Sequence, residues 1–202
     1  MSDSDGGWLV VGLGNPGPQY EHTPHNMGFL TVDRLAELNG IRINRKDSMA
    51  LAGPGNIAGA GVLLAKPQTF MNLSGSSVRQ LMEKYAIAVG RLILVYDDLD
   101  LPWTGVRIRP KGTAPGHNGT ESVIRSIKSL DFPRVRVGVH PGHPLKSGAD
   151  YLLAPMRKAQ LQELDEVLGH SARAVESIIA EGVEMAMTKY NRRARGLIQE
   201  EE

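Results

Sequence analysis

The sequence predicts a single α/β domain in which a mixed, mostly parallel twisted sheet is flanked by helices. Its 202 residues are enough for one such domain with a sizeable core, whereas two domains would be cramped. Strand-like and helix-like apolar patterns alternate along the chain, as they do in βα units. No repeat, low-complexity linker or change in composition divides it. We therefore expect residues 8–193 to form the domain, residues 1–7 a flexible N-terminus and residues 194–202 a polar tail.

The first half contains two predicted buried strands and two predicted helices. The apolar run "WLVVGL" at 8–13 is typical of a buried strand, and "GFLTVDRLAELNG" at 28–40 has the apolar spacing of a helix that ends at Gly40. Short β-like segments over 41–52 precede a second strand, "GVLLAKP" at 61–67. Ser74 is placed to cap a helix whose apolar face contains Val78, Leu81, Met82 and Tyr85.

The second half continues this alternation. "RLILVY" at 91–96 predicts a third buried strand, whereas "GVRIRP" at 105–110 and "RVRVGV" at 134–139 alternate and indicate half-exposed strands. A helix is expected over 118–130. From Pro155 the pattern is helical to Gly182, and a short last helix follows.

Composition excludes several classes of protein. There is no cysteine, which rules out disulfides, thiolate nucleophiles and cysteine-based zinc sites and is typical of a reducing compartment. No apolar run is long enough to span a membrane, and the opening "MSDSDGGW" is acidic and unlike a secretory or transit peptide. We therefore expect a cytoplasmic protein with no membrane partner.

Positive charge is concentrated in one region. The net charge of the chain is only +1, but residues 105–146 contain eight basic side chains and two acidic ones. Such an excess within one region favours an anionic partner, although long basic side chains also cover solvated strand and helix faces.

The glycine pattern Gly12-x-Gly14-x-x-Gly17 after the first strand resembles a dinucleotide-binding fingerprint. That site requires a helix to begin inside the motif, so that its N-terminal amides meet the pyrophosphate. Here Pro18 and Pro24 bound a segment without apolar periodicity, and no acidic residue ends a second strand about 20 positions on. We interpret the pattern as a coincidence and expect no nucleotide cofactor.

Polar side chains follow the predicted strands, where an open α/β sheet binds its ligands. Asn15, Asn72, Asp97 and Asp98 follow the three buried strands, and "GHNG" at 116–119 precedes a helix. Each residue alone is an ordinary turn former or helix cap, but together they indicate a shared cleft. Six histidines are candidate bases, and Asp97 is placed to orient one of them without the sequence showing which.

Two other chemistries fit the sequence poorly. "HPGHP" at 140–144 lacks cysteine partners and the i, i+4 spacing of helical metal ligands, so we expect no metal site. No G-x-S-x-G elbow is present, which argues against the common α/β serine hydrolases.

Several motifs, taken together, resemble those of bacterial-type peptidyl-tRNA hydrolases. They occur in the family's order and approximate spacing from about Trp8 to Arg192: "VGLGNPG", "HNMGF", "KPQTFMNLSG", "DDLDLP", "GHNG" and "RVRVGVHPG". The resemblance implies hydrolysis of the ester between a peptide and the 3′-terminal ribose of tRNA, which recycles tRNA after premature release. It implies no metal, cofactor or covalent intermediate. We expect peptidyl-tRNA as the partner and a monomeric enzyme.

The resemblance also implies roles for individual residues. His25 matches the family's catalytic histidine, and Asp97 the carboxylate that orients it. Arg107 and Arg136 match basic residues that grip the 5′-phosphate of tRNA. The positions matching residues that line the cleft or lie beside the substrate are Asn15, Tyr20, Met71, Asn72 and Asn118.

The sequence departs from the family pattern at a few positions, none of which is one of these predicted site residues. Pro24 stands before the histidine where arginine is common, and Pro115 replaces a glycine in the loop before Asn118. Two alternatives stay open at this point: an RNA-binding protein without catalysis, and a dinucleotide-dependent oxidoreductase. Retention of His25, Asp97 and the asparagines favours the enzyme over the first alternative.

Overall fold

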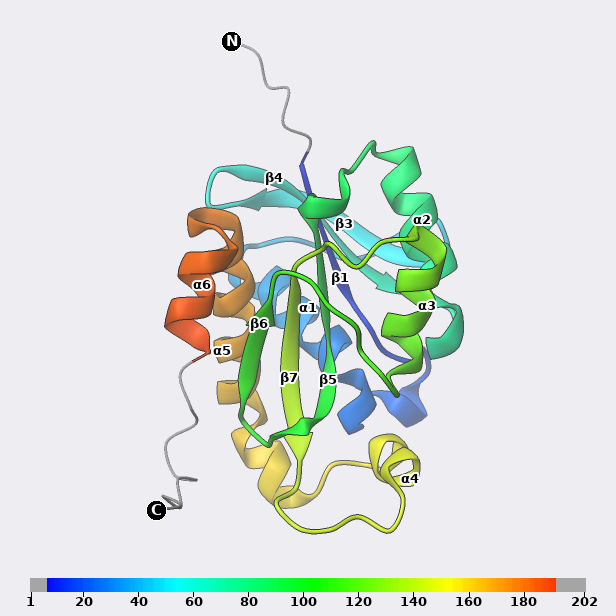
Figure 1. Cartoon of the computed structure of the whole chain (residues 1–202), viewed down its shortest axis with the longest axis vertical. Coiled ribbons are helices and arrows are strands. Elements are labelled where there is room, and N and C mark those ends of the chain that lie inside the picture. The colour runs from blue at the N-terminus through cyan, green and yellow to red at the C-terminus, as the bar shows by residue number, and fades with distance from the viewer. Residues whose placement is uncertain (1–6, 192–202) are drawn as a thin grey trace.

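The computed structural model describes residues 7–191 as one α/β domain, so the predicted flexible N-terminus and polar tail lie almost wholly outside the described residues. Its seven-stranded sheet has the order β2-β3-β4-β1-β5-β7-β6 (Figure 1). The strands are β1 (Trp8–Gly12), β2 (Arg45–Asp47), β3 (Ala50–Ile57), β4 (Ala60–Pro67), β5 (Leu92–Pro102), β6 (Val106–Arg109) and β7 (Arg134–His140).

The four central strands β4, β1, β5 and β7 are parallel, which confirms the predicted sheet type. Antiparallel pairs extend the sheet at both sides, with β3 and β2 beyond β4 and with β6 beyond β7. The helices are α1 (Met27–Leu38), α2 (Ser74–Lys84), α3 (Asn118–Ile127), α4 (Gly148–Leu153), α5 (Lys158–Glu181) and α6 (Val183–Tyr190). The 3₁₀ turns are η1 (Pro18–Tyr20), η2 (Pro24–Asn26), η3 (Met71–Leu73) and η4 (Val89–Arg91).

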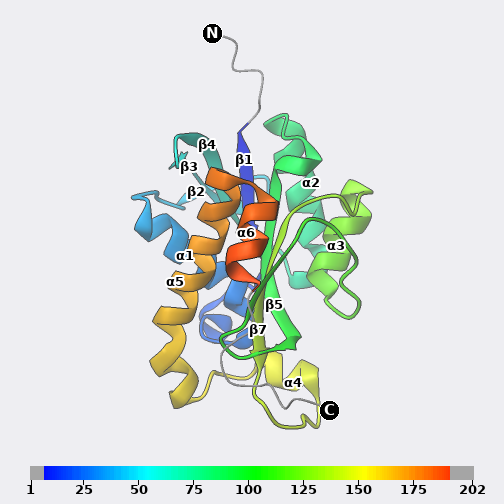
Figure 2. The same ribbon diagram turned by 60° about the vertical axis from the view of Figure 1, so that its left-hand side comes forward.

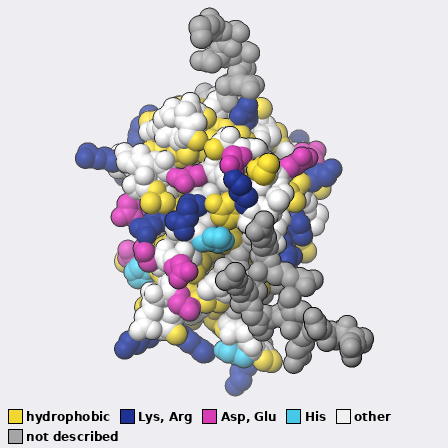
Figure 3. All heavy atoms as spheres, turned by 90° about the vertical axis from the view of Figure 1, so that its left-hand side faces the viewer, with side chains coloured by type: hydrophobic (Ala, Val, Ile, Leu, Met, Phe, Trp, Pro, Cys, Tyr) yellow, Lys and Arg dark blue, Asp and Glu magenta, His cyan; other side chains and the backbone are white. Residues whose placement is uncertain are grey.

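Each face of the sheet has its own core, because successive strand residues point to opposite sides. In β1, Val10 packs into the core under α1, α5 and α6, whereas Leu9 and Val11 pack into the core under α2 and α3. Figure 2 shows the two groups of helices on opposite sides of the sheet. The outer face of α5 and α6 intermixes acidic and basic side chains (Figure 3), and pairs such as Lys189–Glu181 neutralise one another there.

Three expectations about the elements were wrong. β5 continues to Pro102 through a register shift after Asp98, so Asp97 and Asp98 lie within the strand rather than after it. The cap of α2 is Leu73, and the buried Ser74 hydroxyl instead donates to the carbonyl of Met71. The short helix α4 was not predicted; its Ser147 cap accepts from the amide of Asp150.

In the described residues no helix is long and apolar enough to cross a membrane.

The glycine motif brings β1 and α1 into close contact. A Cβ on Gly12 would lie 2.2 Å from the carbonyl oxygen of Gly28, and a Cβ on Gly28 would lie 2.3 Å from that of Val95. The helix after the motif begins only at Met27, ten residues beyond Gly17. These glycines therefore permit close backbone packing, and the motif leads into the short 3₁₀ turn η1 rather than into the α-helix that a dinucleotide site requires.

Candidate active site

His25 and Asp97 form a hydrogen-bonded pair at the carboxyl ends of the central strands. Nδ1 of His25 lies 2.9 Å from Oδ1 and 3.0 Å from Oδ2 of Asp97. Pro24, the departure from the family pattern, occupies the first position of η2, where its fixed φ suits a turn and its missing amide is not needed. The close approach of Gly28 to β5 places η2, and with it His25, next to Asp97.

His117 contacts the same carboxylate, its ring centre 5.2 Å from that of His25, and was missing from the predicted site residues. Its Nε2 lies 3.0 Å from Oδ1 of Asp97, while its Nδ1 accepts from the backbone amide of Thr120 at 3.2 Å as the cap of α3. An accepting Nδ1 carries no proton, so His117 is the neutral tautomer that donates from Nε2. His117 belongs to the "GHNG" motif, but nothing in the sequence predicted that its side chain contacts Asp97.

The charge state of the pair follows from its surroundings. The Asp97 side chain is fully buried, and burial alone would raise its pKa, but the two histidines hold that pKa below its usual range. For His25, burial acts to lower the pKa, and the charge and hydrogen bond of Asp97 outweigh it, so the pKa lies above the ordinary value of 6.5. Asp97 is therefore an ionised acceptor whose charge favours the imidazolium form of His25.

Asn15 and Asn26 connect the first strand with the histidine turn. The backbone amide of Asn15 donates to Oδ1 of Asn26 at 2.9 Å, and Nδ2 of Asn26 donates to the Asn15 carbonyl at 3.0 Å. Oδ1 of Asn15 accepts from the amide of Met71 at 3.0 Å. Asn26 was not predicted as a site residue, although it stands in the "HNMGF" motif; its role depends on contacts eleven residues away.

The other predicted cleft residues surround this network. Met71 is buried on η3, which packs against α3. Asn72 on η3 and Asn118 at the start of α3 are both exposed, so their amide groups are accessible to a ligand. Tyr20 is half-buried at the end of η1, and its carbonyl accepts from Thr23. The predicted residues thus occupy adjoining elements around His25 and Asp97.

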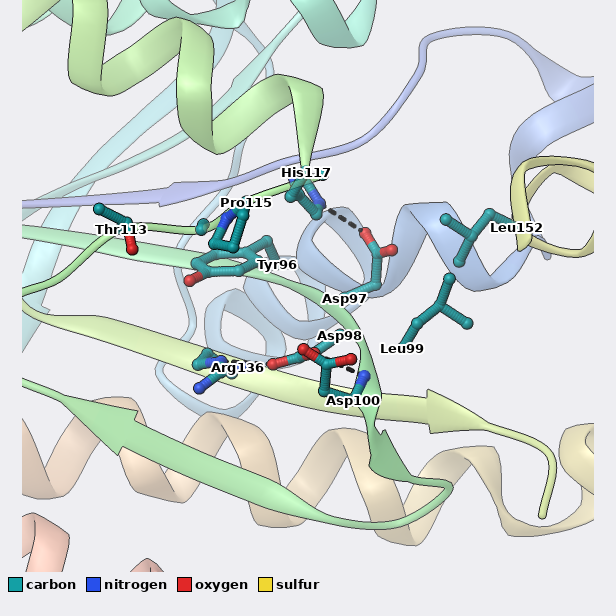
Figure 4. A pocket seen from close by; sticks show the side chains of 12 residues that line it. Tyr96, Asp97, Asp98, Leu99, Asp100, Thr113, Pro115, His117, Arg136 and Leu152 are labelled. Carbon is teal, nitrogen blue, oxygen red and sulfur yellow. Dashed lines mark hydrogen bonds and ion pairs between the residues drawn. The ribbon is translucent and has the colours of Figure 1, made fainter.

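The two predicted phosphate ligands lie directly opposite one another on β6 and β7. Arg107 pairs with Arg136 in the antiparallel register, and like charges in such a pair repel each other. Arg136 also forms an ion pair through Nε with Asp98. A cavity of about 240 Å³ has Arg136, Asp97 and His117 in its walls (Figure 4). Arg107 is not among the residues that line it, so the structure brings only Arg136 to the cavity itself.

The cluster has the composition of a metal site but a different hydrogen-bonding state. One ligand atom each of His25, Asp97 and His117 lies within 4.8 Å of the others. In this arrangement the two imidazoles direct N–H groups at the carboxylate, whereas metal ligation would need unprotonated nitrogens. The same three groups could hold a metal ion only if each imidazole gave up the N–H that faces Asp97.

The chain is similar to known proteins along nearly its whole length. The family model for peptidyl-tRNA hydrolase matches residues 9–197. A peptidyl-tRNA hydrolase of Solibacter usitatus is 60% identical over 96% of this chain and 99% of its own length, and that of Koribacter versatilis is 48% identical over 92% of both. The solved peptidyl-tRNA hydrolase of Acinetobacter baumannii superposes with a TM-score of 0.85 at 31% identity, covering 95% of this chain and 98% of that one. The chain belongs to the peptidyl-tRNA hydrolase family.

Proposed function

We propose that this hydrolase cleaves the ester between a peptide and the 3′-terminal ribose of tRNA by means of a water molecule that His25 activates, and that it thereby recycles tRNA from prematurely released peptidyl-tRNA. The observation that carries the mechanism is the contact of His25 Nδ1 with both oxygens of the buried Asp97 carboxylate, at 2.9 and 3.0 Å. An ester is reactive enough for one general base to suffice without a covalent nucleophile.

The proton path follows from the hydrogen bonds. Because Nδ1–H of His25 donates to Asp97, the lone pair of the ring is on Nε2, which accepts a proton from water as the water oxygen attacks the ester carbonyl. The tetrahedral intermediate then expels the ribose oxygen, and the His25 imidazolium gives this leaving oxygen the proton that it took from water. Thr120 donates to Nδ1 of His117, so this ring presents its Nε2–H to Asp97 and helps to hold the carboxylate in place.

Neutral amides suit the remainder of the site. The side chains of Asn72 and Asn118 are exposed on η3 and α3, and a carboxamide can donate to a developing oxyanion or to a peptide group without reading the peptide's side chains. Either residue is a candidate for the oxyanion contact. An enzyme that accepts nearly any nascent peptide needs this kind of sequence-tolerant binding.

The direct test is a single-turnover assay on labelled peptidyl-tRNA. We expect release of free peptide and of tRNA with an intact 3′ hydroxyl, without added metal or cofactor. A chain that binds this substrate and leaves the ester intact would contradict the proposed function.

The pH dependence of the reaction is expected to report the raised pKa of His25. Only unprotonated His25 can accept a proton from water, so kcat/KM should fall on acidification through that pKa. Since the pKa lies above 6.5, the loss should begin at a higher pH than for an ordinary histidine. A profile of kcat/KM from about pH 5 to 9 measures this. A midpoint below the ordinary histidine value would contradict the assigned base.

The charge of Arg107 and Arg136 is expected to act mainly on tRNA affinity. Guanidinium groups grip phosphate with paired hydrogen bonds and carry no base information. Replacing both by glutamine should raise KM for peptidyl-tRNA about tenfold or more, lower kcat less, and flatten the dependence of KM on salt. A tRNA-free peptidyl ester is the control substrate, and an equal loss on that ester would contradict a phosphate role.

A further inference from the structure

Asp98 points away from the catalytic pair and contacts Arg136. Successive residues of a strand face opposite sides of the sheet, so Asp97 meets the two histidines while Asp98 meets β7. Oδ2 of Asp98 forms an ion pair with Nε of Arg136, and Figure 4 shows the two side chains facing each other at the cavity. The Asp98 side chain is 8% exposed and that of Arg136 is 23% exposed. The pair is therefore shielded from solvent on the carboxylate side.

The carboxylate is itself held in place. Oδ1 of Asp98 accepts from the backbone amide of Asp100 at 2.8 Å, where the strand register shifts. With one oxygen bound to the backbone, the other is presented to Arg136 in a defined direction. Asp98 contacts the Nε edge of the guanidinium, and the planar group then has its two terminal nitrogens as the fork that can bind a phosphate.

We propose that Asp98 is a positioning residue that orients Arg136 for the 5′-phosphate of the tRNA substrate. The inference rests on the proposed function, in which Arg136 is a phosphate ligand. Arg107 stands opposite Arg136 and repels it, so an unrestrained Arg136 would turn away from its neighbour. The ion pair with Asp98 opposes that movement. Because the Arg136 side chain is then already ordered, it loses less conformational entropy when phosphate binds.

Positioning and simple electrostatics predict opposite results for the loss of this carboxylate. Asp98 is a negative charge beside an anion-binding group. If charge were its whole contribution, its removal would strengthen phosphate binding. If it orients Arg136, its removal weakens phosphate binding although the site becomes more positive.

The experiment measures KM and kcat for an acylated acceptor-stem minihelix that carries either a 5′-monophosphate or a 5′-hydroxyl. Asp98→Asn keeps the acceptor for the Asp100 amide and removes the charge. We expect KM for the 5′-phosphate substrate to rise about tenfold, roughly the loss of one charge-assisted hydrogen bond, with kcat nearly unchanged. KM for the 5′-hydroxyl substrate should stay within about twofold. Asp98→Glu should recover part of the phosphate preference.

Two further variants separate positioning from other effects. Asp131→Asn removes an exposed carboxylate that does not line the cavity and takes no part in the ion pair, and should not raise KM for either substrate. In Arg136→Gln, adding Asp98→Asn should cause no further loss, because Asp98 acts through Arg136.

The proposal is overturned by a lower KM in Asp98→Asn, by an equal rise for both substrates, or by additive losses in the double variant. It also fails if the wild-type enzyme hydrolyses both minihelices with the same KM, which leaves the ester hydrolysis itself intact. Absence of any wild-type turnover would instead contradict the proposed function.

Discussion

His25→Ala is expected to abolish nearly all turnover while sparing tRNA binding. No other group in the described site combines a free imidazole lone pair with an ionised carboxylate partner, since the second histidine on Asp97 has its Nδ1 occupied by Thr120. Loss of a general base lowers kcat by roughly 10²–10⁴-fold. Single-turnover rates on peptidyl-tRNA measure the loss, and filter binding of deacylated tRNA measures the binding that should persist.

A matched control is available three residues earlier. His22 is exposed, and its carbonyl accepts from the amide of Met156, a contact that alanine preserves. His22→Ala should therefore retain wild-type turnover. If His25→Ala keeps more than about a hundredth of the wild-type rate, His25 is not the base.

Asp97→Asn is expected to lower kcat by about 10²-fold or more, as replacement of an orienting carboxylate does in other hydrolases. Nδ1 of His25 lies within 3.0 Å of both carboxylate oxygens, so the NH₂ group of asparagine would face the N–H of His25 whichever way the amide is turned. One imidazole must then change tautomer or move. His25 also loses the charge that raises its pKa, so burial is left to lower it.

The pH dependence of the residual activity in Asp97→Asn is a second test of the role of Asp97. The acid limb of its pH–rate profile should move to lower pH than in the wild type, because the residual base has a lower pKa. Asp131→Asn, an exposed carboxylate outside the cavity, again serves as the charge-matched control and should leave the profile in place. Turnover within tenfold of wild type, with an unmoved acid limb, would show that Asp97 does not act on His25.

The fold was largely predictable because local patterns decide its elements. The largely apolar runs at 8–13 and 91–96 became β1 and the start of β5 at the centre of the sheet, where both faces are buried. The alternating "GVRIRP" became the edge strand β6, but "RVRVGV", expected to be half-exposed, became the interior strand β7, in which even Arg134 is buried. The end of β5 was missed because its last residues are polar, and their strand conformation depends on pairing with β7 rather than on apolar spacing.

The chemistry of the site was predictable only in its parts. By itself, the sequence determined the order of the elements and, through the family's motifs, named His25 and Asp97 as candidate site residues. Only the tertiary structure decided which groups meet: Asp97 with two histidines, Asn26 with Asn15, and Asp98 with Arg136. Hydrogen bonds and ion pairs act over about 3 Å, so a contact across 72 or 20 residues of chain depends on strand order and register, which only the packing of the whole sheet determines.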